Sequence, residues 1–119
     1  MKLDRLCTTI HNTEKLRELI LENPDLPLVV FAGEEANSGD YTYVCCTDVR
    51  ADKGEILDCA GPNDELIYTD RDELEDDVSE ELYDEVGNIP DDEFEKLLRE
   101  RLAKYEEYWV ECILVYVNN

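Results

Sequence analysis

The chain has 119 residues, a hydrophobic content of 43% and a formal net charge of −21, from 32 acidic and 11 basic side chains. A chain of this length buries a modest core, so we expect one domain over residues 1–119. Its charge repels nucleic acid and anionic lipid, which excludes both as expected direct partners, and it attracts basic protein surfaces. No apolar stretch approaches the roughly 18 residues of a membrane span, and we expect no membrane association.

The amino-terminal third predicts a helix followed by a strand. The spacing of apolar residues in 1–11 is compatible with a short helical turn. Asn12 or Thr13 can cap the next helix, which we expect to end at Asn23-Pro24 because proline disfavours helical geometry in the residue before it. The β-branched and aromatic run from Leu28 to Ala32 predicts a short strand.

The middle of the chain predicts a hairpin. The run 41–49 has the composition of a strand, and residues 51–54 (ADKG) have the composition of a turn that ends in a glycine. Residues 55–59 would then form the partner strand. A further short strand is expected at 65–68.

The stretch from Thr69 to Val86 predicts a helix with a narrow apolar stripe. Leu74, Val78, Leu82 and Val86 recur at every fourth residue. Thr69 or Asp70 would form the N-cap, and Gly87-Asn88 would end the helix.

A second carboxy-terminal helix and a last strand complete the predicted fold. Pro90 would open this helix, and residues 108–117 have apolar residues in both alternating sets, which is typical of a central strand covered on both faces. We therefore expect an α+β domain, with an antiparallel or mixed sheet of four to five strands and about three helices packed on it.

Acidic residues are concentrated on the helix of the stretch 69–86. From Asp70 to Glu85 the chain carries ten carboxylates and one base, Arg71. At about 1.5 Å per residue this is about one charge per 2.4 Å, between the 1.7 Å of double-stranded DNA and the 3.4 Å of a single strand. A sequence selected only for solubility, which is the plainest alternative, would intersperse lysines to relieve the repulsion. Lysine is absent from residue 54 to residue 95.

The side of this helix opposite the apolar stripe is the predicted partner-binding surface. Its carboxylates could stand in for phosphates, an aromatic residue on its flank could contact arginine, and the first turn of the next helix would extend the patch. These residues are Asp72, Glu73, Asp76, Asp77, Glu80, Tyr83, Asp84, Asp91, Asp92 and Glu93.

The sequence offers little for catalysis or for a bound metal or cofactor, and we expect none of the three. The five cysteines have no regular spacing and are expected to be reduced, as in a cytoplasmic protein. Cys45 and Cys46, as neighbours on a strand, would point to opposite faces and could not bind one metal ion. A small enzyme that uses Cys45, Cys46 or His11 remains an alternative, which would require two of them close together at a cleft.

Two segments of the chain carry a resemblance to known proteins. Residues 16–35 (LRELILENPDLPLVVFAGEE) and 92–119 (DEFEKLLRERLAKYEEYWVECILVYVNN) resemble short acidic proteins of phages and prophages of Gram-positive bacteria. The resemblance implies a phage setting and a place of action in the host cytoplasm. Phage proteins of this size and charge include anti-CRISPR and anti-restriction inhibitors that mimic DNA.

The functional expectation combines the acidic surface with this resemblance. We expect a non-enzymatic inhibitor that occupies the basic surface of a nucleic-acid-binding host protein, for example a CRISPR effector. The alternative is an acidic adaptor or accessory protein, which would bind a basic phage or host protein without displacing nucleic acid.

Overall fold

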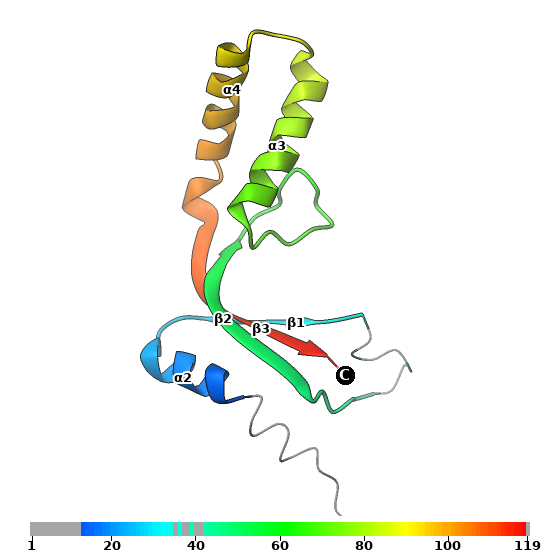
Figure 1. Cartoon of the computed structure of the whole chain (residues 1–119), viewed down its shortest axis with the longest axis vertical. Coiled ribbons are helices and arrows are strands. Elements are labelled where there is room, and N and C mark those ends of the chain that lie inside the picture. The colour runs from blue at the N-terminus through cyan, green and yellow to red at the C-terminus, as the bar shows by residue number, and fades with distance from the viewer. Residues whose placement is uncertain (1–12, 35, 37–38, 40–41, 119) are drawn as a thin grey trace, which may run out of the picture. The chain divides into compact units, whose positions relative to one another are not determined.

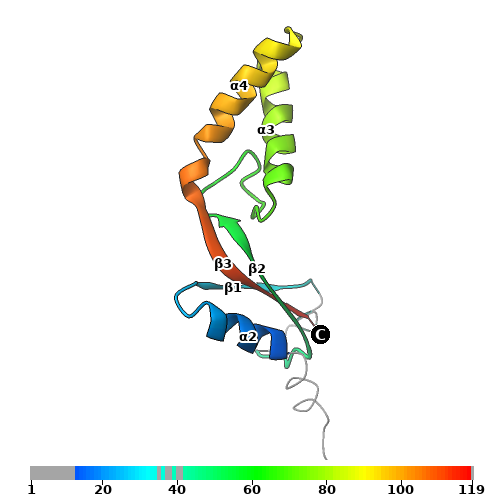
Figure 2. The same cartoon turned by 60° about the vertical axis from the view of Figure 1, so that its left-hand side comes forward.

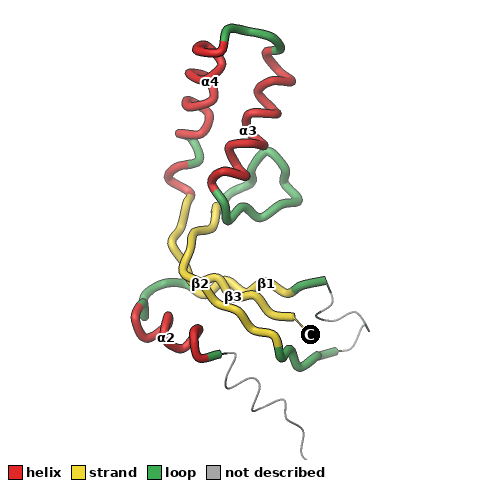
Figure 3. Tube along the Cα trace, viewed as in Figure 1, coloured by secondary structure: helices red, strands yellow, loops and turns green. Residues whose placement is uncertain are grey.

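The computed structural model describes residues 13–34, 36, 39 and 42–118, which form helices and one three-stranded sheet (Figures 1 and 3). The sheet is mixed, its strand order is β1-β3-β2, and β1 runs parallel to β3. The expected short turn within residues 1–11 lies outside the described residues. In chain order the elements are α2 (Glu14–Glu22), β1 (Leu28–Ala32), β2 (Asp48–Leu57), α3 (Arg71–Val86), α4 (Asp91–Ala103), the 3-10 helix η1 (Glu106–Tyr108) and β3 (Trp109–Asn118).

The chain divides into two compact units. Unit 1 comprises the described residues up to Gly54 together with those from Glu111 onwards, and unit 2 comprises Glu55–Val110. Strands β2 and β3 contribute residues to both units. No described helix combines the length and the apolar character that crossing a membrane would require.

The core of unit 1 lies between α2 and one face of the sheet. Leu19 of α2 packs against Ile113 and Val115 of β3, and all three side chains are buried. β3 is the central strand of the sheet, and Cys112 and Leu114, whose side chains alternate with those of Ile113 and Val115, are buried as well. The predictions of the helix ending near Asn23-Pro24, of the strand Leu28–Ala32 and of a central last strand are confirmed.

Unit 2 is built on α3 and α4, which lie side by side and are joined by a short turn (Figures 1 and 2). The apolar stripe of α3 is buried against Leu98 of α4, as its four-residue spacing predicted. The Asp70 side chain caps α3 by accepting a hydrogen bond from the Asp72 backbone N–H at 2.9 Å. Gly87 ends α3 with a φ of 65°, a conformation that favours glycine.

The expected sheet of four to five strands is wrong, because the predicted hairpin does not form. Strand β2 continues from Asp48 to Leu57 through the residues that were expected to turn. Gly54 serves a different purpose: a Cβ atom there would lie 2.8 Å from Cδ1 of Leu114 on the neighbouring strand. The glycine therefore allows a close approach of two strands, which is a known use of glycine inside a sheet. Of the strand expected over 41–49, only the last two residues belong to β2, and Tyr41 lies outside the described residues.

The short strand expected at 65–68 is also wrong, because these residues lie in the loop before α3. Leu66 and Ile67 remain 42% and 61% exposed, so this apolar run does not enter a sheet. Tyr68 is instead buried in the core of unit 2, where its carbonyl oxygen accepts a hydrogen bond from the Leu57 N–H at 2.9 Å.

Candidate partner-binding surface on α3 and α4

The acidic residues of α3 that flank α4 form ion pairs with it. Arg99 Nη2 lies 2.6 Å from Glu75 Oε1, and Arg101 contacts both Glu81 and Glu85. The hydrogen bond from Arg101 holds the pKa of the Glu85 carboxyl below its ordinary value. We call these three glutamates the inner flank of α3.

A second set of carboxylates on α3 points to solvent and forms no ion pair within the part of the chain that the structure describes. All of its members are exposed. Tyr83, which is 58% exposed, lies on the same side of the helix. We call this set of five the outer flank: Asp72, Glu73, Asp76, Glu80 and Asp84.

Asp77 was predicted as part of the same surface, and the structure gives it an internal partner. It is half-buried, and its Oδ2 accepts a hydrogen bond from the Tyr68 hydroxyl at 2.7 Å. Burial, followed by this hydrogen bond, raises the pKa of Tyr68 to about 12. Oδ2 of Asp77 therefore already accepts a hydrogen bond within the chain, unlike the carboxylates of the outer flank. No sequence signal identified this contact, because Tyr68 lies in a loop that was expected to be a strand.

The turn between α3 and α4 contains a hollow of about 500 Å³. Four predicted residues line it together: Asp76, Glu80, Tyr83 and Asp91. The helical spacing of the first three could place them on one face from sequence alone. The prediction missed the other lining residues: Ser79 follows from the same helical spacing, whereas the turn and the packing of α4 determine the positions of Gly87, Asn88, Ile89 and Phe94. Asp92 and Glu93 are exposed in the first turn of α4 and do not line this hollow.

Arg71, the one base between residues 54 and 95, is held within unit 2. Its guanidinium donates to both carboxylate oxygens of Glu55 at 2.8 and 3.0 Å and to Glu106 at 2.8 Å. Its Cζ lies 4.8 Å from the ring centroid of Trp109. The hydrogen bond from Arg71 lowers the pKa of Glu55. Within the part of the chain that the structure describes, Arg71 forms no ion pair with the outer flank.

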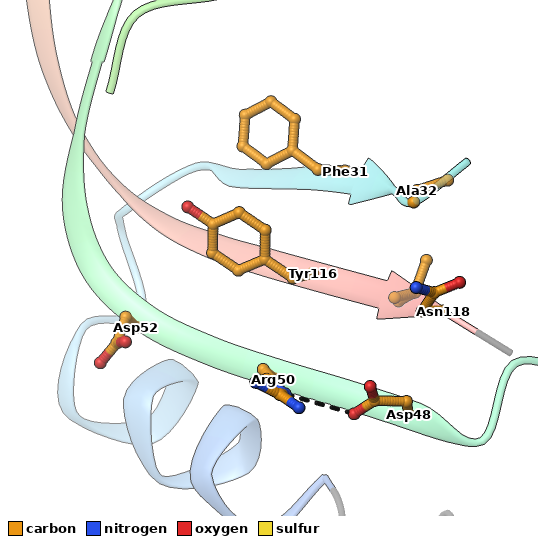
Figure 4. Close-up of a pocket in the computed structure, with 9 residues that line it drawn as sticks. Phe31, Ala32, Asp48, Arg50, Asp52, Tyr116 and Asn118 are labelled. Carbon is orange, nitrogen blue, oxygen red and sulfur yellow. Dashed lines mark hydrogen bonds and ion pairs between the residues drawn. The ribbon is translucent and has the colours of Figure 1, made fainter. Parts of the chain in front are cut away.

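A second hollow, of about 580 Å³, belongs to unit 1 and lies over all three strands (Figure 4). The rings of Phe31 and Tyr116 stack there with centroids 5.4 Å apart. Arg50 Nε lies 3.4 Å from Asp48 Oδ1. Among the described residues that line it there is no serine, cysteine, histidine or lysine, and its ionisable side chains are those of Asp48, Arg50, Asp52 and Tyr116.

The cysteines give no paired reactive site within the described residues. Cys45, Cys46 and Cys59 are free, Cys112 is buried, and Cys45 and Cys46 lie in the loop before β2 and not in a strand. Burial, together with the charge of Asp58, raises the pKa of the Cys59 thiol, which disfavours the nucleophilic thiolate. His11 lies outside the described residues. Among those described, no group of three or more His, Cys, Asp or Glu side chains is arranged to hold a metal ion.

Comparisons of the chain with protein-family models, with curated proteins and with solved structures find no match.

Proposed function

We propose that this chain is a non-enzymatic phage-type inhibitor, acting in the host cytoplasm, that binds the basic surface of a nucleic-acid-binding host protein such as a CRISPR effector. The outer flank of α3 carries the proposal, because its five carboxylates are exposed and have no intrachain ion pair among the described residues. A cationic surface can therefore contact them without breaking an existing salt bridge.

The spacing of these charges supports a role as phosphate surrogates. The outer flank extends from Asp72 to Asp84, which is about 20 Å of helix, or about one charge per 4 Å. A single DNA strand carries about one charge per 3.4 Å. Asp91, Asp92 and Glu93 add exposed carboxylates at the start of α4.

The electrostatics of the whole chain favour this mode of binding. Its net charge of −21 accelerates encounter with a basic surface and opposes direct contact with nucleic acid. The same charge makes the affinity depend on ionic strength, because exposed charges are screened within about 10 Å at 0.1 M salt.

Charge reversal on the outer flank tests the proposal. The measurement uses purified CRISPR effector nucleases of Gram-positive bacteria, each with a labelled target DNA duplex, and follows release of the duplex as the chain is added. We expect at least one nuclease to release DNA. We also expect the triple variant Glu73→Lys, Glu80→Lys, Asp84→Lys to compete at least about 100-fold less well, since close charge pairs across an interface each couple by about 1.5 kcal/mol or more.

A matched control separates a local effect from a general effect of net charge. Glu18→Lys, Glu22→Lys, Asp25→Lys makes the same change in net charge on exposed residues of unit 1. We expect this variant to compete nearly as well as the wild type. Binding that is equally strong in 50 mM and 500 mM NaCl would exclude phosphate mimicry, and binding that leaves the DNA in place would indicate an adaptor.

A further inference from the structure

The hollow at the turn between α3 and α4 combines three carboxylates with two aromatic rings. Asp76 and Glu80 come from α3, and Asp91 comes from the first turn of α4. The rings are those of Tyr83 and Phe94. None of the described residues that line the hollow is basic. It is therefore an anionic, partly aromatic recess.

Elsewhere in unit 2 an arginine side chain already lies among carboxylates and an aromatic ring. Arg71 lies between the carboxylates of Glu55 and Glu106 and over the ring of Trp109. A guanidinium suits such a setting because its planar group donates several hydrogen bonds and also stacks on aromatic faces. The hollow offers the same two kinds of group, carboxylates and an exposed ring, without a cation of its own chain among the lining residues.

The arrangement favours a guanidinium over other cations. A lysine ammonium is a compact, strongly hydrated charge and gains less from a ring face. A metal ion needs several ligands around one point, and the described acidic residues form no such group. A guanidinium spreads its five N–H donors over a wider area, which suits carboxylates contributed by two helices.

We propose that this hollow receives an arginine side chain of the protein partner, with Tyr83 stacking on the guanidinium and Asp76, Glu80 and Asp91 accepting its hydrogen bonds. The inference rests on the proposed function for the existence of a basic partner, and it specifies which basic residue is recognised and where.

Peptide titration of the full chain tests the inference without the unidentified partner. Hexa-arginine and hexa-lysine are added separately to the ¹⁵N-labelled protein, and the amide signals of Gly87 and Asn88, which line the hollow, are followed. We expect both signals to shift, with hexa-arginine binding several-fold more tightly than hexa-lysine. Equal affinities, or no shift at the turn, would overturn the inference.

The variant Tyr83→Leu tests the stacking contact at constant net charge. An exposed cation–π contact corresponds to about a two- to fivefold change in affinity, so we expect a loss of that size for hexa-arginine and little change for hexa-lysine. Tyr43→Leu is the matched control, because Tyr43 is 92% exposed and does not line the hollow. A second variant, Asp91→Asn, should also weaken binding of hexa-arginine.

The two proposals fail in different ways. If Tyr83→Leu has no effect while the triple lysine variant of the outer flank loses competition with DNA, the arginine site is wrong and the proposed function stands. If hexa-arginine binds selectively at the turn but no nuclease releases DNA, the arginine site stands and the proposed function is wrong.

Discussion

The two flanks of α3 have the same chemistry and opposite environments. Glu75, Glu81 and Glu85 on the inner flank are paired with the arginines of α4, whereas the outer flank forms no ion pair among the described residues. The identity of an acidic residue therefore does not decide its role. Its angular position relative to a neighbouring helix decides whether it contributes to the fold or remains available to a partner.

The outer flank opposes formation of the helix on which it lies. Like charges three or four residues apart destabilise a helix by a few tenths of a kcal/mol per pair. The buried residues Leu74, Val78 and Leu82 offset this repulsion by packing in the core of unit 2. Removing charges from the outer flank should therefore stabilise the folded chain, whereas removing them from the inner flank should destabilise it. Added salt should weaken both effects.

The largest expected loss of stability comes from removing the hydrogen bond between Tyr68 and Asp77, which lies at the edge of the outer flank. Tyr68→Phe removes the hydroxyl that donates to Asp77. A hydrogen bond to a charged group is worth about 1.5–3 kcal/mol, and partial exposure of Asp77 places the expected loss of unfolding free energy at about 1–2 kcal/mol. The measurement is urea denaturation followed by the fluorescence of Trp109, the only tryptophan of the chain.

Two further observations check this interpretation. Tyr83→Phe removes a hydroxyl from an exposed ring and should leave the urea midpoint unchanged. The folded-state pKa of Tyr68, about 12, lies above its ordinary value of 10, so the stability from its neutral hydroxyl is present below pH 10 and is lost between pH 10 and 12. Equal midpoints for Tyr68→Phe and the wild type would contradict the assigned hydrogen bond.

A smaller effect is expected for the ion pair between Arg71 and Glu55, in which pairing lowers the pKa of a carboxylate. Arg71 lowers the pKa of Glu55 from its ordinary value of 4.5, so the pair stabilises the folded state fully above pH 4.5. This stability is lost as the pH falls through the lowered pKa. The pair is solvent-exposed, so we expect Glu55→Gln to cost at most about 1 kcal/mol at pH 7.

The pH dependence of that difference is the decisive measurement. The gap in unfolding free energy between wild type and Glu55→Gln should shrink towards zero in acid. Glu65→Gln serves as the control, because Glu65 is exposed and forms no ion pair among the described residues. A gap that stays constant from pH 7 to pH 3 would show that the ion pair is not its source.

The smallest expected effect is a change in how the melting temperature depends on salt, which compares the two flanks directly. The double variant Arg99→Gln, Arg101→Gln removes the cations of the inner flank and leaves repulsion on both flanks. We expect a melting temperature slightly below that of the wild type at low salt, and a steeper rise with added NaCl, because salt screens repulsion but no longer weakens these pairs. Differential scanning fluorimetry across a salt series measures both.

A control with the same change in charge uses a lysine of α4 and the lysine at its C-cap. Lys96→Gln, Lys104→Gln also removes two cations from the α4 region, and neither lysine forms an ion pair among the described residues. If both double variants have the same salt slope, the inner flank has no special electrostatic role.

The sequence predicted the elements whose signals are local. The stripe from Leu74 to Val86, the cap at Asp70 and the glycine at Gly87 define α3 within the helix itself, and the structure confirms all three. Apolar side chains on both faces of the last strand identified β3 as the central strand. Each of these signals lies within a single helix or strand and its capping residues.

The predictions that failed depended on contacts between distant residues. Gly54 was interpreted as a turn residue, although Leu114 of another strand explains its lack of a side chain. The division of α3 into flanks could not be predicted either, because it depends on where Arg99 and Arg101 lie once α4 packs against α3. Asp77 was likewise grouped with the outer flank, because its hydrogen bond from Tyr68 depends on how the loop before α3 folds.

The ion pair between Lys53 and Glu111 bears on how the chain could be re-engineered. Lys53 Nζ lies 2.9 Å from Glu111 Oε1, and these residues stand at the two places where unit 1 is interrupted by the continuous segment Glu55–Val110. Adjacent ends of this kind are typical of an insertion into a host scaffold. The segment Glu55–Val110 could therefore be grafted into a loop of an unrelated protein, while a short linker joins Gly54 to Glu111 in unit 1.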